Sequence, residues 1–206
     1  MTSHEESAEM AAAFQGVRWF YLACAGEATL ALVAAVLGYF FNQSPVERLY
    51  WRFDDFGIGL AAALPPFLFF VLMLRKTPRV LQDIREALNQ TARPLFAHWS
   101  VLQLAAISIA AGVGEELLFR GFVQEKLADV FGSTPALLAA SVLFGCVHPI
   151  TWNYALVTAV IGVYLGGLMI VTGNLLPAIV AHAAYDFVAL VYFLRIHDSP
   201  SFNKPS

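Results

Sequence analysis

The sequence predicts an all-α membrane protein, a polytopic transmembrane bundle of about seven membrane-embedded helices with one interfacial amphipathic helix. Two observations of composition predict this class. Apolar residues make up 59% of the 206 residues and charged residues only 13%, and the mean hydropathy is +0.66. Since a soluble domain carries about 25% charged residues, this chain lacks the polar side chains to cover a globule in water. As a third observation, several apolar segments approach the roughly 20 residues that a helix needs to cross a bilayer.

Two spans are predicted in the first part of the chain. Residues 19–41 are apolar apart from Glu27, and residues 57–74 carry no charge. Pro65-Pro66 in the second segment predicts a kinked helix rather than a break, because membrane helices tolerate proline. Residues 80–90 then alternate apolar and charged faces with helical periodicity, which predicts an amphipathic helix at the membrane interface.

Five further helices are predicted in the rest of the chain. Gly112 and Gly114 are expected to end one helix, and Pro149 and Pro177 divide the apolar run that follows. The predicted ranges are 95–111, 115–131, 135–148, 153–172 and 177–194.

The distribution of basic residues predicts the orientation. Residues 75–93 carry five of the twelve Lys and Arg residues, which places this segment and the N-terminus on the cytoplasmic side by the positive-inside rule. The side that holds the C-terminus stays open. A net charge of −3 offers no basic footprint, so nucleic acid is not expected as a partner.

Polar residues interrupt the apolar C-terminal half in three places, and an ionisable residue inside a span indicates a functional site by default. In each place two side chains stand at i and i+4, on one helical face. Glu116 and Arg120 can form an ion pair, whereas Glu115 is left outside that pair. The other two pairs are Phe144 with His148 and His182 with Asp186.

These residues together suit the activation of water. A carboxylate beside an imidazole can take a proton from water, and a second imidazole can donate to a developing oxyanion. Each residue also has a plain structural alternative, since acids stabilise a helix N-terminus and a buried histidine can satisfy a backbone carbonyl. Their occurrence together in an otherwise apolar region favours function. Glu27 has no such partner near it in the sequence and receives no role.

The three motifs E-E-x-x-x-R, F-x-x-x-H and H-x-x-x-[N/D], with the flanks GEELLFRGF and PAIVAHAAYD, resemble the CPBP family of intramembrane proteases. This family includes the CAAX prenyl-protein endopeptidases (Ras-converting enzyme) and the bacterial Abi or bacteriocin-immunity proteins. The resemblance covers residues 95–194, which it identifies as a protease core, and the first two helices are not diagnostic. The regions on either side are N-terminal membrane helices with the interfacial helix over 1–94 and a polar C-terminal tail over 195–206.

The resemblance also implies roles for individual residues. Glu115 would be the general base, His148 would help to hold and activate water, and His182 would assist the tetrahedral intermediate beside Asp186. Many relatives have Asn at the position of Asp186, and an ionised aspartate cannot donate to an oxyanion as an amide can. Asp186 therefore either stays protonated in its low-dielectric setting or orients His182, and of these two roles we favour the second. Glu116, Arg120 and Phe144 would be structural residues around the site.

The sequence does not decide whether the predicted reaction uses a metal ion. Glu115, His148 and His182 could supply three ligands and leave a fourth position for water, as in catalytic zinc sites. The family has been described both as metalloproteases and as metal-free enzymes with a glutamate-activated water. Zinc and the absence of any cofactor are therefore both consistent with the sequence.

The function expected from these observations is an intramembrane endopeptidase, a multi-pass protein of the cell membrane that hydrolyses a peptide bond through water activated by carboxylate and histidine. Its partners would be the lipid bilayer and a peptide or protein substrate, prenylated or not. Two alternatives stay open: a non-catalytic membrane scaffold or bacteriocin-immunity-type binding protein, and a proton or ion transporter. Because residues 153–172 span about 28 Å, His148 and His182 can meet only near mid-depth or beside a strongly tilted helix.

Overall fold

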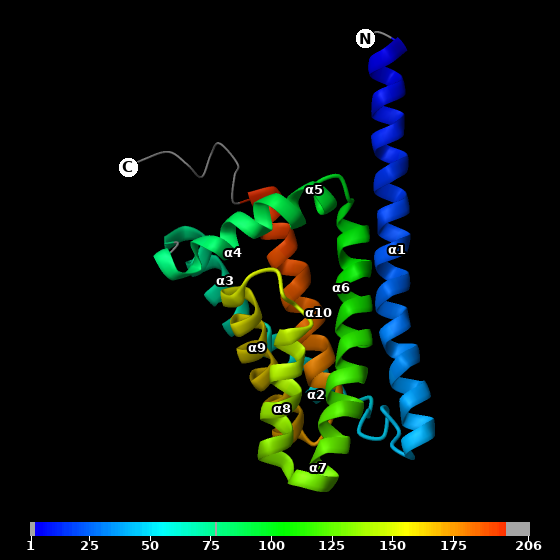
Figure 1. The fold of residues 1–206 in the computed structure, drawn as a ribbon, viewed down its shortest axis with the longest axis vertical. Helices are drawn as coiled ribbons and strands as arrows, with labels where there is room; N and C mark the ends of the chain where they lie inside the picture. The colour runs from blue at the N-terminus through cyan, green and yellow to red at the C-terminus, as the bar shows by residue number, and fades with distance from the viewer. Residues whose placement is uncertain (1–2, 77, 197–206) are drawn as a thin grey trace.

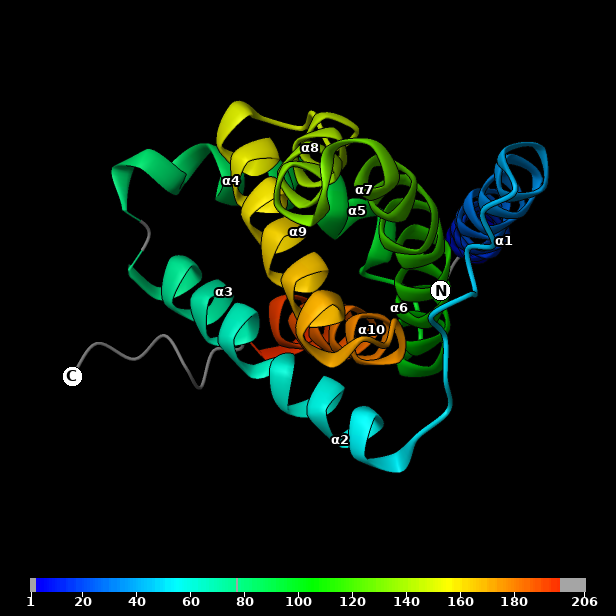
Figure 2. The ribbon, with the colours of Figure 1, turned by 90° about the horizontal axis from the view of Figure 1, so that it is seen from below.

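The structure, a computed structural model, describes residues 3–76 and 78–196, and every regular element within them is helical (Figure 1). α1 is the longest helix and stands at one edge of the bundle beside α6 (Figures 1 and 2). α10 packs against α2, α6 and α9 and so lies in the middle of the bundle. The bounds of the long helices are α1 Ser3–Phe41, α2 Phe53–Ala62, α3 Leu64–Lys76, α6 Val101–Glu116, α7 Glu125–Phe131, α8 Ser133–Cys146, α9 Trp152–Thr172 and α10 Leu176–Val191.

Five helices in the described part of the chain are long and apolar enough to cross a membrane, so the expected count of about seven embedded helices is not confirmed. α2 and α3 together form one of these spans. A turn at Ala63 separates them just before the two prolines, which agrees with the kink predicted there. A sixth apolar helix, α8, is shorter than the others. The five spans are Gly16–Phe41, Phe53–Lys76, Val101–Phe131, Trp152–Thr172 and Leu176–Ile196.

The count differs because α6 does not end at its glycines. It continues through a π-helical stretch, η3 (Leu117–Gln124), into α7. A Cβ atom on Gly112 would lie 2.9 Å from Cβ of Ala183 on α10, and one on Gly114 would overlap the carbonyl oxygen of Glu27 on α1. The two glycines therefore allow the neighbouring helices to approach closely. They do not break the helix, and two predicted spans become one.

α8 explains how a functional residue can lie inside the bundle at the end of a helix. Its 14 residues reach only about 21 Å at 1.5 Å per residue, less than the roughly 30 Å hydrocarbon core. The connection from α8 to α9 lies between the two ends of the bundle along its long axis (Figure 1). His148 belongs to this connection.

The segment predicted as an amphipathic helix forms four short helical pieces that run across the end of the bundle (Figure 1). Its residue Ile84 is buried and packs with Leu74 of α3 and Phe193 near the C-terminal end of α10. The apolar face is thus confirmed as a cover for the bundle, and its location at a membrane interface stays a prediction. The pieces are η1 Arg79–Leu81, α4 Gln82–Ala87, η2 Leu88–Ala92 and α5 Arg93–Phe96.

The last described helical turn, η4 (Tyr192–Ile196), ends on the same side as this segment. The Arg195 guanidinium donates to the carbonyl oxygens of Ala97 at 2.8 Å and Trp99 at 2.7 Å, just before α6 begins. If residues 75–93 are cytoplasmic, Ile196 is on the cytoplasmic side too. The predicted tail over 195–206 lies outside the described residues from position 197 onward.

At the opposite end, a buried asparagine fixes the connection between α1 and α2. The Asn174 amide nitrogen donates to the carbonyl oxygen of Tyr50 at 2.8 Å and to Oδ2 of Asp55 at 2.8 Å. Its amide oxygen accepts from the backbone N–H groups of Tyr50 at 3.0 Å and Leu176 at 3.1 Å. Sequence analysis missed this network, because nothing in the sequence pairs positions 50 and 174.

Candidate active site

Three side chains from three separate elements meet inside the bundle. Glu115 lies near the end of α6, His148 follows α8, and His182 lies within α10. Oε1 of Glu115 is 3.7 Å from Nε2 of His148, and its Oε2 is 3.8 Å from Nε2 of His182. Both distances exceed a direct hydrogen bond but lie within reach of one bridging water. The structure therefore brings together the three residues that the sequence singled out, with one carboxylate facing two imidazoles.

Small residues create this meeting point. Gly112 and Ala183 allow α6 and α10 to pack closely one turn from Glu115 and beside His182. Gly145 does the same for α8 and α9, since a Cβ atom there would lie 2.9 Å from Cβ of Ala159. Close packing of both helix pairs brings the end of α8 against α10.

The ion pair expected from the i, i+4 spacing is present and fully buried. Arg120 Nη1 lies 2.9 Å from Oε1 of Glu116, and the two side chains are 1% and 0% exposed. Arg120 Nη2 also donates to the carbonyl oxygen of Gly162 at 3.2 Å, and its guanidinium stands 4.2 Å from the centre of the Phe144 ring. These contacts tie η3 to α8 and α9.

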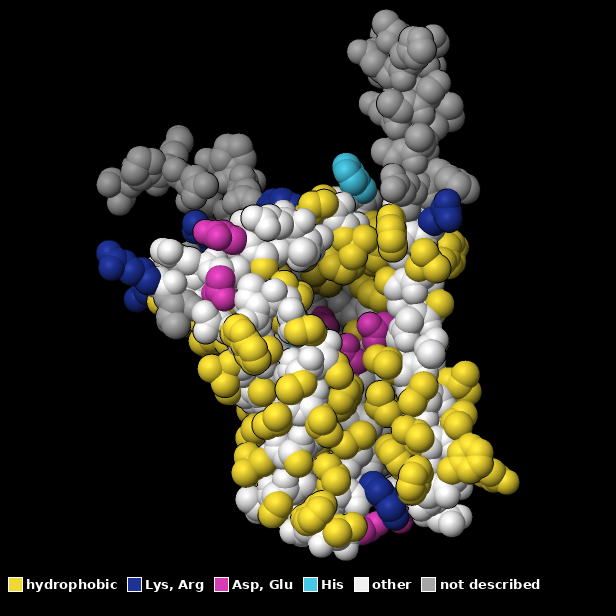
Figure 3. Space-filling view, viewed as in Figure 1, with side chains coloured by type: hydrophobic (Ala, Val, Ile, Leu, Met, Phe, Trp, Pro, Cys, Tyr) yellow, Lys and Arg dark blue, Asp and Glu magenta, His cyan; other side chains and the backbone are white. Residues whose placement is uncertain are grey.

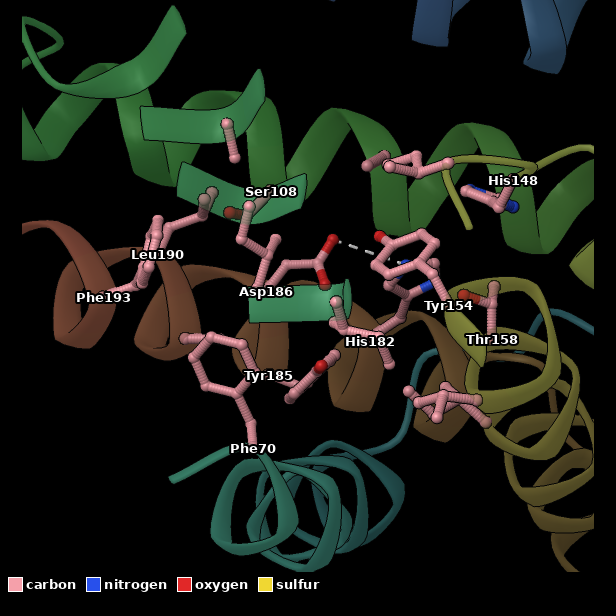
Figure 4. A pocket seen from close by; sticks show the side chains of 18 of the residues that line it. Phe70, Ser108, His148, Tyr154, Thr158, His182, Tyr185, Asp186, Leu190 and Phe193 are labelled. Atoms are coloured by element: carbon pink, nitrogen blue, oxygen red, sulfur yellow. Dashed lines mark ion pairs between the residues drawn. The ribbon is translucent and has the colours of Figure 1, made fainter. Parts of the chain in front are cut away.

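Glu116 has a second contact that sequence analysis missed. Nδ1 of His182 lies 2.8 Å from Oε1 of Glu116. Because that carboxylate already accepts from Arg120, it acts as the acceptor here and the proton lies on Nδ1 of His182. Nε2 of His182 is thereby directed toward Glu115 and toward Asp186, whose Oδ2 is 3.5 Å away (Figure 4). Glu116 is thus the residue at Nδ1 of His182, and the expected orienting role of Asp186, which faces Nε2, stays a prediction.

Phe144 fixes the other imidazole. Its carbonyl oxygen lies 2.7 Å from Nδ1 of His148, and a carbonyl can only accept, so Nδ1 carries the proton. Nε2 of His148 is therefore the nitrogen that faces Glu115. The Phe144 ring also lies beside both imidazoles, at 4.8 Å from the His148 ring and 6.1 Å from the His182 ring.

These side chains open onto a cavity of about 460 Å³. Its polar end holds the site, whereas its other end is apolar and lies under the segment 79–96, with Ile84 and Leu88 among its walls. A space-filling view shows acidic side chains within a hollow whose surroundings are hydrophobic (Figure 3). The acidic residues that line the cavity are Glu27, Glu115 and Asp186.

Glu27 is thus a site residue that sequence analysis set aside. It lies on α1, and its side chain reaches the same cavity as Glu115. Its Oε2 atom is buried without a hydrogen-bond partner among the described residues. The sequence did contain one indication of a functional role for Glu27, because it is a single charged residue in an apolar span. Its neighbours in the cavity lie on α6 and α10, far from it in the sequence, so no local pattern could pair them.

Glu115, His148 and His182 are the three predicted metal-ligand candidates. Across residues 3–76 and 78–196, no group of three His, Cys, Asp or Glu side chains is arranged to hold a metal. Glu115, His148 and His182 stay the residues that would approach a metal ion.

Comparison with known proteins gives one match. Residues 97–188 match the family model described as Rce1-like, type II CAAX prenyl endopeptidase. No curated protein and no solved structure matches the chain. The matched segment contains Glu115, Glu116, Arg120, Phe144, His148, His182 and Asp186, whereas Glu27 lies outside it.

Proposed function

We propose that Glu115 and His148 of this multi-pass membrane protein activate a water molecule for peptide-bond hydrolysis, a proposal supported by the match of residues 97–188 to the Rce1-like, type II CAAX prenyl endopeptidase family. The observation that carries the proposal is the position of one carboxylate, only 11% exposed, between the Nε2 atoms of two histidines, at 3.7 and 3.8 Å. We assign the activity to the cell membrane, on a peptide or protein segment that enters the cavity from the bilayer or its interface.

The first step is proton transfer. A water held between Glu115 and Nε2 of His148 gives a proton to the Glu115 carboxylate as its oxygen attacks the carbonyl carbon of the substrate. Such general-base catalysis contributes about 10²–10⁴-fold. The fixed Nδ1–H of His148, bonded to the Phe144 carbonyl, keeps Nε2 available as an acceptor for the water.

The second step is collapse of the tetrahedral intermediate. His182 faces the site with Nε2 and donates to the oxyanion when its ring carries both protons, and the carboxylate of Glu116 at Nδ1 stabilises that form. The proton held by Glu115 passes to the leaving nitrogen, the C–N bond breaks, and the products are a carboxylic acid and an amine. No bond to the enzyme forms in this sequence.

The proposal is tested with the purified chain in proteoliposomes and a panel of peptides that differ only in the presence of a prenyl group. We expect cleavage at one bond, with one oxygen from ¹⁸O-labelled water in the new carboxyl group by mass spectrometry. Glu125→Gln is a suitable control, because Glu125 lies on α7 in an ion pair with Arg48 and does not line the cavity. Binding of peptides without cleavage would favour a scaffold, and Glu115-dependent proton flux without cleavage would favour a transporter.

A further inference from the structure

Glu27 has a carboxyl oxygen that the protein itself leaves without a partner. Its Oε2 atom is buried, and no hydrogen bond reaches it from the described residues. Buried polar atoms in folded proteins are nearly always paired with protein or water, so this oxygen is available to accept from a bound ligand. The side chain lines the same cavity as Glu115 and His148, which is where the substrate of the proposed reaction has to bind.

The position of Glu27 is built into the packing of α1. The carbonyl oxygen of Glu27 lies against Gly114, where any side chain would overlap it. Gly114 is the residue immediately before Glu115. This contact holds the Glu27 backbone against the same turn of α6 that carries the proposed general base.

The other acidic groups of the cavity already have cationic or imidazole partners. Glu115 faces His148 and His182, and Asp186 faces His182. For Glu27 no ion pair occurs within the described part of the chain, and no Lys or Arg stands among the residues that line the cavity. One carboxyl group is therefore left over, in surroundings that are mostly apolar.

We propose that Glu27 is a specificity-determining residue that pairs with a positively charged side chain, Lys or Arg, next to the scissile bond of the substrate. This inference rests on the proposed function and deepens it by naming a substrate class. A cationic group supplies both the missing hydrogen-bond donor and the missing countercharge. An acidic side chain at the same substrate position meets Glu27 and Asp186 and is repelled, since like charges across an interface suppress wrong partners.

The test uses three peptides that differ only at the residue flanking the cleaved bond: lysine, the uncharged isostere norleucine, and glutamate. A hydrogen bond between charged groups is worth about a tenfold to hundredfold preference. We expect kcat/KM to be at least about tenfold higher for the lysine peptide than for norleucine, and lowest for glutamate. In Glu27→Gln the lysine-to-norleucine ratio falls to about one, whereas in the control Glu125→Gln it stays at the wild-type value.

Equal cleavage of the lysine and norleucine peptides by the wild-type protein overturns this inference and leaves the peptidase intact. A ratio that survives in Glu27→Gln overturns it as well, because the preference then has another source. If Glu27→Gln does not fold, Glu27→Asp keeps the charge and must keep the order of the three peptides. If no form cleaves any peptide, the proposed function fails. The same peptides are then compared by binding, where equal affinities for lysine and norleucine overturn the inference and a Glu27-dependent preference supports it.

Discussion

Nδ1 of His182 lies 2.8 Å from Oε1 of Glu116, although the two residues are 66 positions apart in the chain. The same oxygen accepts from Arg120 at 2.9 Å. A buried ion pair is therefore continuous with the proposed oxyanion donor, and Glu116 acts on two sides. It neutralises Arg120 within the fold and fixes which nitrogen of His182 faces the cavity.

Arg120→Ala is expected to destabilise the protein by about 3–5 kcal/mol, because it leaves Glu116 buried without a countercharge. Thermal unfolding in detergent measures the loss. The matched control is Arg48→Ala, whose ion pair with Glu125 is 48% exposed on the arginine side and should cost at most about 1 kcal/mol. An Arg120→Ala protein of normal stability but without activity would place Arg120 in the catalytic machinery instead.

Glu116→Gln should lower both stability and turnover, with the larger effect on stability. The amide oxygen can still accept one hydrogen bond, but it no longer offers a charge to both Arg120 and His182. The tautomer of His182 is therefore less firmly set, and ¹⁵N chemical shifts of its ring nitrogens should reveal a mixture in the variant. A single Nδ1–H tautomer in Glu116→Gln would contradict the orienting role of Glu116.

Asn174→Ala is expected to cost about 1–3 kcal/mol, since it leaves buried backbone N–H groups and Asp55 without their hydrogen-bond partner. Asn174 is only 2% exposed, so water does not replace these bonds easily. Thermal unfolding is measured against the control Gln43→Ala, whose side-chain hydrogen bond to Glu47 lies at the surface. Equal stability of the two variants would show that the hydrogen bonds from Asn174 to Tyr50 and Asp55 contribute little to the stability of the fold.

Acid should loosen the segment 79–96 from α9. The Asn153 amide donates to both carboxylate oxygens of Asp83, at 3.1 and 3.2 Å. Lost hydration raises the pKa of Asp83, but hydrogen bonds from Asn153 and Thr151 outweigh that effect and leave the pKa below its ordinary value. A pKa lowered in the folded state means that the stabilisation is present above the unfolded-state pKa and disappears as the pH falls through the lowered value.

The protection factors of residues 79–92, which compare observed with intrinsic exchange at the same pH, should therefore fall at acidic pH in the wild-type protein. Asp83→Asn should have lower protection factors at neutral pH and lose this pH dependence. Equal protection factors at both pH values in the wild-type protein would rule out Asp83 as the titrating contact.

Composition and local spacing were sufficient for part of this structure. The all-helical class follows from the apolar content, and the Glu116–Arg120 pair follows from its i, i+4 spacing, because both depend on residues close in the chain. The convergence of Glu115, His148 and His182 was expected from the resemblance of their motifs to one protease family. Their roles in catalysis stay predictions.

The rest depends on how distant helices pack. Gly112 and Gly114 suggested a helix end, since glycine is common at helix ends. Glycine also allows membrane helices to pack closely against one another. In this structure the two glycines serve such close contacts. The contact between Glu116 and His182 and the entry of Glu27 into the cavity both arise where α6 meets α10 and α1. No spacing rule within one helix could reveal them.

Glu115→Gln in the peptide-cleavage assay tests the central claim most directly. The variant keeps the size of the side chain and its capacity for hydrogen bonds, so folding and peptide binding should persist, while turnover should fall at least about a hundredfold because the general base is removed. Glu125→Gln, outside the cavity, should cleave at the wild-type rate. A Glu115→Gln protein that hydrolyses the peptide as fast as the wild type would contradict the assigned mechanism.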